Sequence, residues 1–414
     1  MSQYLIEDTE VYDPRLPMDG PSPIGSSDKE PRKPKLAFAM RSMRVFAEVI
    51  VDPKLVLSWL LATLGAPVAM IGLLVPLRVL GEVVPKRVAQ RHVDQIARMP
   101  WAPMVVCALA AAAIVLTALT QRGILAGWII GAAIFCVGVS RGLAHLSDAA
   151  SDHGFARSDP NQNAWHRSAN SAPLGLFAFA LLLMLGWTDM FTFIALGLGV
   201  AAIIWAMLAV LIARFAVKAA PQACSLPTTD APVSPEIKRW AVARGLLSST
   251  ILTPPFLILF GSGAQVFGHI WALMFAHVFA AVIAPRIWSR LSLSAGRILQ
   301  VSSALVFAAM IGALALGQFA MAGFAPALSA VMFLISFAFH GVQASGDSVL
   351  SRLESWETRI AAKKLANTSL VAAMILGGGV ALVATYIGIS AVLGIFAVAA
   401  LVSIWLSRGL STQS

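Results

Sequence analysis

The sequence predicts an all-α membrane protein with twelve transmembrane helices arranged as two pseudo-symmetric six-helix bundles. Of its 414 residues, 58% are hydrophobic and only 12% are charged, whereas a soluble domain carries about a quarter charged residues. Apolar stretches of about 20 residues, long enough to cross the hydrocarbon core, recur along the chain. A polar stretch near the middle divides these apolar segments into two groups of six.

Positive charges are distributed unevenly between the connections. The chain has 30 Lys and Arg residues and a formal net charge of +10. Only Arg122 is assigned to the loops of the opposite side, and only Arg78 to the interior of a span. Because cytoplasmic loops retain Lys and Arg, this asymmetry predicts a multi-pass inner-membrane protein with both termini in the cytoplasm. Topology and anionic lipid headgroups account for the charge, so no nucleic-acid partner is expected.

The predicted elements follow in order. Residues 1–44 are polar and Pro-rich, as in a disordered cytoplasmic tail. The N-terminal bundle, 45–213, is predicted to hold spans near 45–66, 68–88, 101–120, 123–144, 166–187 and 190–213. A linker rich in Pro, Ser and Thr covers 214–240. The C-terminal bundle, 241–408, is predicted to hold spans near 241–261, 265–285, 297–318, 324–347, 366–387 and 389–407, before a short cytoplasmic tail, 409–414.

The first span is the least regular of the twelve. Asp52-Pro53-Lys54 interrupts it and leaves an uninterrupted apolar run only from Leu55 to Leu64. We therefore expect a short helix here, preceded by an amphipathic segment that lies at the membrane interface.

The second span is the most distinctive. It reads Gly72-Leu-Leu-Val-Pro76-Leu-Arg78-Val-Leu-Gly-Glu82-Val-Val-Pro85, after Gly65-Ala66-Pro67. This stretch is similar to a poorly characterised bacterial permease branch with a GLLVPIRE…LLPQ pattern. With its six-plus-six spans and polar central loop, the chain resembles the major facilitator superfamily over residues 45–408. The resemblance implies a permease whose two bundles rock about a central cavity.

Arg78 and Glu82 are the first candidate site residues. They lie four residues apart, so on a helix they share one face. An Arg at the centre of a membrane helix costs about 2.5–3.5 kcal/mol on insertion scales and normally faces the interior of the bundle. In the functional interpretation, Arg78 binds an anionic substrate group and Glu82 pairs with it or exchanges a proton. The alternative is an ion pair with a purely structural role.

The C-terminal half offers candidates for proton coupling. His340 lies well inside the tenth span, Asp347 near the cytoplasmic end of that span, and His277 near the middle of the eighth. A histidine or a desolvated carboxylate can carry a coupling proton. The alternatives are a histidine bonded to a neighbouring helix and an aspartate that caps a helix end.

A second group of charges is predicted at the inner ends of the spans. Arg141, His145 and Asp148 share one helical stripe, and Glu354 and Glu357 lie in an inner loop of the other half. They are candidates for a salt-bridge gate, with solvated helix ends as the alternative.

The predicted function is secondary active transport of a small solute, with an anionic solute favoured by Arg78 and protons as the coupling ion. The chain carries no phosphate-binding loop, zinc-protease motif or nucleophile elbow, so we expect neither an enzyme nor a cofactor or metal. The expected partners are a small-molecule substrate and membrane lipids, with the chain as a monomer. The alternative is a non-transporting assembly or pigment-delivery factor with a transporter-like fold, associated with a larger membrane complex.

Overall fold

The computed structural model describes residues 34–88, 99–151, 190–215, 233–261, 270–291, 293–319, 324–353 and 356–410. Within these ranges every regular element is a helix, which confirms the all-α prediction. Ten helical segments in them are long and apolar enough to cross a membrane. They correspond to all the predicted spans except the first and the fifth, and the fifth (166–187) lies outside the described residues.

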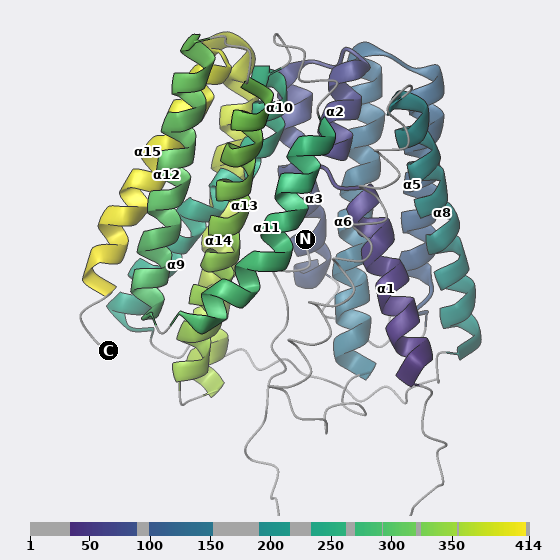
Figure 1. Ribbon diagram of the computed structural model, residues 1–414. Coiled ribbons are helices and arrows are strands. Elements are labelled where there is room, and N and C mark those ends of the chain that lie inside the picture. The colour runs from purple at the N-terminus through teal and green to yellow at the C-terminus, as the bar shows by residue number, and fades with distance from the viewer. Residues whose placement is uncertain are drawn as a thin grey trace, which may run out of the picture.

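The two halves of the chain form two groups of helices (Figure 1). The N-terminal group contains α1 (Pro34–Ile50), α2 (Val56–Thr63), α3 (Val68–Val88), α5 (Ala102–Thr120), α6 (Gly123–Ser151) and α8 (Met190–Phe215). The C-terminal group contains α9 (Pro235–Ser249), η4 (Thr250–Leu252), α10 (Thr253–Gly261), α11 (Ile270–Arg290), α12 (Ala295–Phe319), α13 (Phe324–Arg352), α14 (Trp356–Ile387), α15 (Ile389–Ser407) and η7 (Arg408–Leu410).

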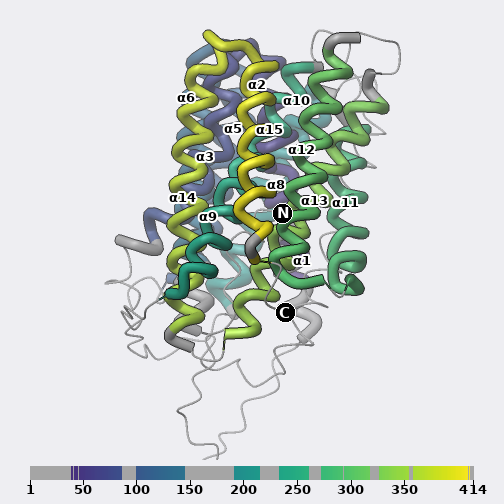
Figure 2. Tube along the Cα trace, turned by 90° about the vertical axis from the view of Figure 1, so that its left-hand side faces the viewer, coloured from purple at the N-terminus to yellow at the C-terminus, as the bar shows by residue number. Residues whose placement is uncertain are grey.

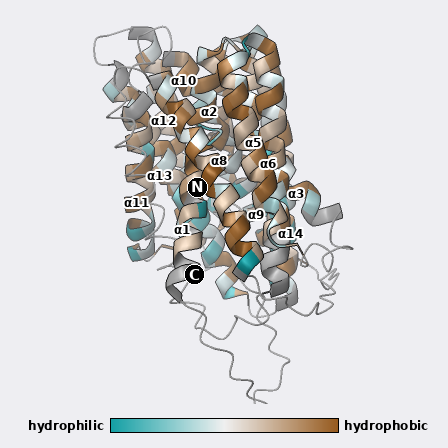
Figure 3. Cartoon of the chain, turned by 90° about the vertical axis from the view of Figure 1, so that its right-hand side faces the viewer, coloured by the Kyte–Doolittle hydropathy of each residue, from teal (hydrophilic) through white to brown (hydrophobic). Residues whose placement is uncertain are grey.

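Within each half, many of the main contacts join helices that are not consecutive in the chain. In the N-terminal half α3 packs on α6, and α5 packs on both α6 and α8. In the C-terminal half α12 and α11 pack on α13, and α14 packs on α9. Large apolar side chains remain exposed on the outer faces, for example Leu109, Ile203 and Leu376, and Figure 3 shows hydrophobic residues along most of the helices. Such faces suit contact with lipid.

The halves meet mainly where α3 lies against α14, and α2 also contacts α10 (Figure 2). Small residues allow this approach. A Cβ atom added at Gly72 would lie 2.6 Å from the Ala381 Cβ and 2.7 Å from the Phe256 ring, and one added at Gly378 would lie 3.5 Å from Pro76. Close helix contacts in membranes are typically built from such small residues.

The first span of each half is broken near its middle. In the N-terminal half, residues 51–55 separate α1 from α2, and in the C-terminal half η4 separates α9 from α10. Pro53 and the Pro254-Pro255 pair lie at these breaks, where proline removes helical hydrogen bonds. The matching breaks support the predicted pseudo-symmetry between the halves.

Three sequence-based boundaries need correction. Residues 34–44 were expected in a disordered tail, but α1 begins at Pro34. The amphipathic segment was expected at the membrane interface, yet α1 packs against α8 and buries Ala47 and Glu48. Residues 235–240 were expected in the linker but form the start of α9, where the Ile237 N–H donates to Ser234 Oγ over 3.3 Å. In the first and third cases the helix begins before its apolar segment, which hydropathy does not detect.

Candidate functional site

Glycines bring α3 and α6 into direct backbone contact around Arg78 and Glu82. A Cβ atom at Gly138 would collide with the carbonyl oxygen of Arg78, and one at Gly142 would lie 2.5 Å from that of Glu82. Only glycine therefore fits at these two positions. The close approach places Arg141, on the same helix as both glycines, beside the acidic residue of α3.

A buried ionic cluster occupies the interior of the N-terminal half. Glu48 on α1 is its centre: Glu48 Oε1 lies 3.2 Å from Arg44 Nε, and Glu48 Oε2 lies 3.4 Å from Arg141 Nη1 and 4.0 Å from Arg78 Nη2. Arg141 Nε lies 3.7 Å from Glu82 Oε2. Glu48, Arg78, Glu82 and Arg141 are each 7% exposed or less. The buried ionic cluster, comprising Arg44, Glu48, Arg78, Glu82 and Arg141, thus joins α1, α3 and α6.

The cluster changes the predicted pairing. Arg78 is buried, as expected for a charged residue at the middle of its span, and Glu48 is an ion-pair partner that the sequence did not indicate. Arg141 was expected at an inner gate or a solvated helix end. It is instead 3% exposed and contacts both Glu48 and Glu82, because the glycines of α6 let it reach α3.

Lys54 extends from the break in the first span toward the other half. It is 3% exposed, and its ammonium lies 5.4 Å from the centre of the Phe339 ring on α13. Hydrogen bonds shape the break: the Ser58 hydroxyl donates to the Pro53 carbonyl over 2.6 Å, and the Lys54 N–H donates to Asp52 Oδ1 over 3.4 Å. The Asp52 carboxylate attracts the Lys54 ammonium electrostatically, and Arg78 and Arg141 repel it. Lys54 therefore connects the buried ionic cluster to the C-terminal half.

A small inter-half cavity lies beside Lys54. Its lining comprises Lys54, Ile251, Pro254, His277, Ile335, Ser336 and Phe339. The volume is about 10 Å³, room for about one water molecule. His277 Nδ1 lies 2.6 Å from Ser336 Oγ, and His277 Nε2 is buried without a hydrogen-bond partner among the described residues.

The three predicted coupling candidates separate in space. His340 is 4% exposed, lies one turn after Ser336 on α13, and interacts electrostatically with His277 and Lys54. Asp347 is exposed, interacts with Arg244, and lies about 16 Å further along α13 than Ser336. The structure thus brings His277 and His340 together with Lys54, and places Asp347 at the inner end of α13.

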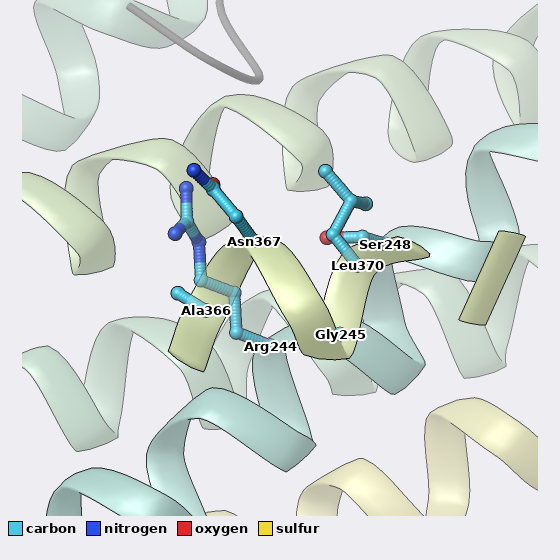
Figure 4. Close-up of a pocket in the computed structure, with 6 residues that line it drawn as sticks. All are labelled: Arg244, Gly245, Ser248, Ala366, Asn367 and Leu370. Atoms are coloured by element: carbon cyan, nitrogen blue, oxygen red, sulfur yellow. The ribbon is translucent and has the colours of Figure 1, made fainter. Parts of the chain in front are cut away.

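A second pocket lies between α9 and α14 (Figure 4). It is lined by Arg244, Gly245, Ser248, Ala366, Asn367 and Leu370, and the free volume inside it is about 0 Å³. Arg244 lies 5.4 Å from the centre of the Trp240 ring. This pocket has no room for a solute, and its Arg is held by an aromatic ring and Asp347.

The remaining gate candidates fall outside what the structure describes. His145 and Asp148 belong to the last turns of α6 and Glu357 to the first turn of α14, but their side chains are not among the described ones, and Glu354 lies outside the described residues. In the described part of the chain no group of three or more His, Cys, Asp or Glu residues could hold a metal ion.

Sequence reasoning missed Glu48 and Lys54. A signal was present, because both lie within an otherwise apolar stretch that Asp52-Pro53 interrupts. In transporters, discontinuous helices often mark the binding region.

Comparison with known proteins identifies the fold. No protein-family model matches the sequence, and no curated protein sequence is significantly similar to it. Among solved structures, a bacterial homologue of the iron transporter ferroportin in its inward-facing state gives a TM-score of 0.64 at 12% identity, covering 92% of this chain and 98% of that one. The same homologue in its outward-facing state gives 0.52 at 12% identity, covering 92% and 99%.

Two further transporters are similar over their whole length. A POT family transporter in complex with a thioalcohol-conjugated peptide gives a TM-score of 0.65 at 12% identity, covering 92% of this chain and 96% of that one. The nucleoside transporter NupG gives 0.60 at 14% identity, covering 91% and 97%. The predicted major-facilitator-type fold is therefore confirmed, and these neighbours are membrane transporters rather than enzymes.

Proposed function

We propose that this chain is a secondary active transporter that moves a small anionic solute across the inner membrane by alternating access, coupled to protons. Its termini are then cytoplasmic. The structural neighbours act on iron, a peptide and a nucleoside. Because such similar folds serve different solutes, the solute of this chain is inferred from its own side chains.

The excess of buried positive charge carries the proposal. Among the described residues of this interior, three cations are each 3% exposed, namely Lys54, Arg78 and Arg141, and the carboxylates buried with them are Glu48 and Glu82. Asp52 is only half-buried, so the described buried set holds one more cation than carboxylates. Burying a charge without a counterion is costly, so this interior favours an anion. We assign its recognition to the region around Arg78 and Lys54.

The interface between the halves supports alternating access. All four ion pairs described for the buried ionic cluster lie within the N-terminal half, one inside α1 and three between its helices. The inter-half contacts of α3 with α14 consist of small apolar residues such as Gly72 and Ala381. The halves can therefore separate without breaking these ion pairs. The greater similarity to the inward-facing homologue agrees with the close packing of α3 on α14.

Flux measurements on reconstituted protein test the proposal. Proteoliposomes with an imposed pH gradient should show saturable uptake of a small organic anion, and no uptake should occur without protein. Arg78→Gln and Glu82→Gln should each reduce uptake about 10-fold or more, the effect of losing a charged hydrogen bond. The control is Arg122→Gln, because Arg122 is exposed and its described contacts, the end of its own helix and the Phe191 ring, do not belong to the buried ionic cluster. Unchanged uptake in both cluster variants contradicts the site assignment.

The same flux measurement distinguishes transport from the alternative function. A non-transporting assembly or pigment-delivery factor has no solute flux in vesicles and copurifies with a larger membrane complex. Absence of saturable flux for every anion, together with such copurification, contradicts transport.

A further inference from the structure

We infer that the inter-half cavity is a subsite for a monocarboxylate with an apolar body, in which Lys54 binds the carboxylate and His277 hydrogen-bonds to it. This inference rests on the proposed transport function and names its substrate class. It adds two residues, one from each half, to those assigned above.

The polar groups of the cavity are suited to one carboxylate. Lys54 supplies a buried ammonium, and in the described part of the chain its ring contact with Phe339 is not accompanied by an ion pair. His277 lines the same cavity and has its Nδ1 occupied by Ser336, which leaves the buried Nε2 for a ligand. A buried polar group without a partner is costly. A carboxylate oxygen between Lys54 and His277 would satisfy both.

The rest of the lining selects what accompanies the carboxylate. Ile251, Pro254, Ile335 and Phe339 present apolar surface, which favours an aliphatic or aromatic body. Lys54 is the one cation in the lining. A second negative charge would therefore be buried without a counterion, which is strongly unfavourable. The cavity thus discriminates against dicarboxylates and phosphate dianions.

The division of the subsite between the halves links binding to movement. Lys54 comes from the N-terminal half, while His277 and the apolar lining come from η4, α10, α11 and α13. With a volume of about 10 Å³ the cavity is smaller than any carboxylate. A solute enters only when these helices move away from Lys54, which is the motion that alternating access provides.

Anion-induced currents on proteoliposomes adsorbed to a solid-supported membrane test the inference. The probes are valerate and benzoate, with valeramide as the neutral analogue, and succinate and phosphate as doubly charged comparisons. Wild-type protein should respond to valerate or benzoate and not to valeramide, succinate or phosphate. Lys54→Gln should raise the half-saturating concentration at least about 10-fold, as expected for loss of a charged partner. Lys238→Gln, at an exposed lysine of α9, should leave it unchanged.

A second variant covers the case in which Lys54→Gln does not fold. His277→Gln keeps a polar side chain and should raise the half-saturating concentration at least about 3-fold, consistent with losing one hydrogen bond. An unchanged value in either folded variant overturns the inference while transport stands. A response confined to succinate or phosphate also overturns the inference alone. No response to any of the anions overturns both the inference and the proposed function.

Discussion

Arg141 on α6 lies 3.4 Å from Glu48 on α1, and this ion pair lies deep inside the N-terminal half. The guanidinium also lies 3.7 Å from Glu82 on α3. One side chain thus links three helices in the buried interior of the N-terminal half. The arrangement gives a structural role to a residue whose sequence position suggested a solvated helix end or a gate.

Removing Arg141 should destabilise the protein. Arg141→Met removes the guanidinium that pairs with Glu48 and Glu82, and breaking a buried pair by removing one partner costs about 3–5 kcal/mol. The double variant Arg141→Met/Glu82→Gln should recover part of the loss, because it also removes the negative charge that Arg141 balances in the wild-type protein. Thermal unfolding in detergent measures both. Equal stability of Arg141→Met and wild type would contradict the assigned ion pairs.

The contact between α3 and α6 should tolerate no side chain. In Gly138→Ala the new Cβ meets the Arg78 carbonyl, so α3 must shift, at a cost of about 1–3 kcal/mol for overpacking. Gly199→Ala on α8 is the matched control, since nothing lies within 4 Å of its Cβ position. That variant should be neutral or slightly stabilising, as alanine favours helix over glycine. Similar unfolding temperatures for the two variants would argue against the close packing.

Proton coupling should depend on His340 and not on Asp347. His340 lies near Lys54 and His277, whereas Asp347 is exposed at the inner end of α13. His340→Gln should abolish accumulation driven by a pH gradient and retain solute exchange at equal pH. Asp347→Asn should retain both. Uptake into vesicles with and without the pH gradient distinguishes the two variants. Gradient-driven uptake in His340→Gln would show that another residue carries the proton.

Most of the membrane spans could be predicted from the sequence, because a helix that crosses the lipid must be apolar over about 20 residues and because Lys and Arg gather in the loops of one side. Leu109 and Leu376, for instance, are exposed on the outer faces of the helices, where an apolar side chain needs no protein neighbour because it can contact lipid. Arg78 was also predicted correctly to face the interior, since a charged residue inside an apolar helix is costly in contact with lipid.

What the sequence could not provide was which helix faces meet. Glu48 and Lys54 lie in a segment that hydropathy assigned to the interface, and only the packing of α1 and the break at Pro53 show that both are buried. Arg141 reaches Glu82 because Gly138 and Gly142, which have no side chains, allow the backbone of α6 to lie directly against that of α3. No single-sequence pattern encodes that approach.

The most direct measurement is flux through protein whose halves are linked at their interface. In a variant carrying Pro76→Cys on α3 and Gly378→Cys on α14, with Cys107, Cys136 and Cys224 replaced by serine, the two Cβ positions lie 3.5 Å apart, within the range that a disulfide requires. Each single-cysteine variant is the control. Oxidation should abolish saturable anion uptake and reduction should restore it, because transport requires α3 and α14 to separate. Persistent uptake in the fully cross-linked protein, or no saturable uptake in the reduced one, would contradict alternating access.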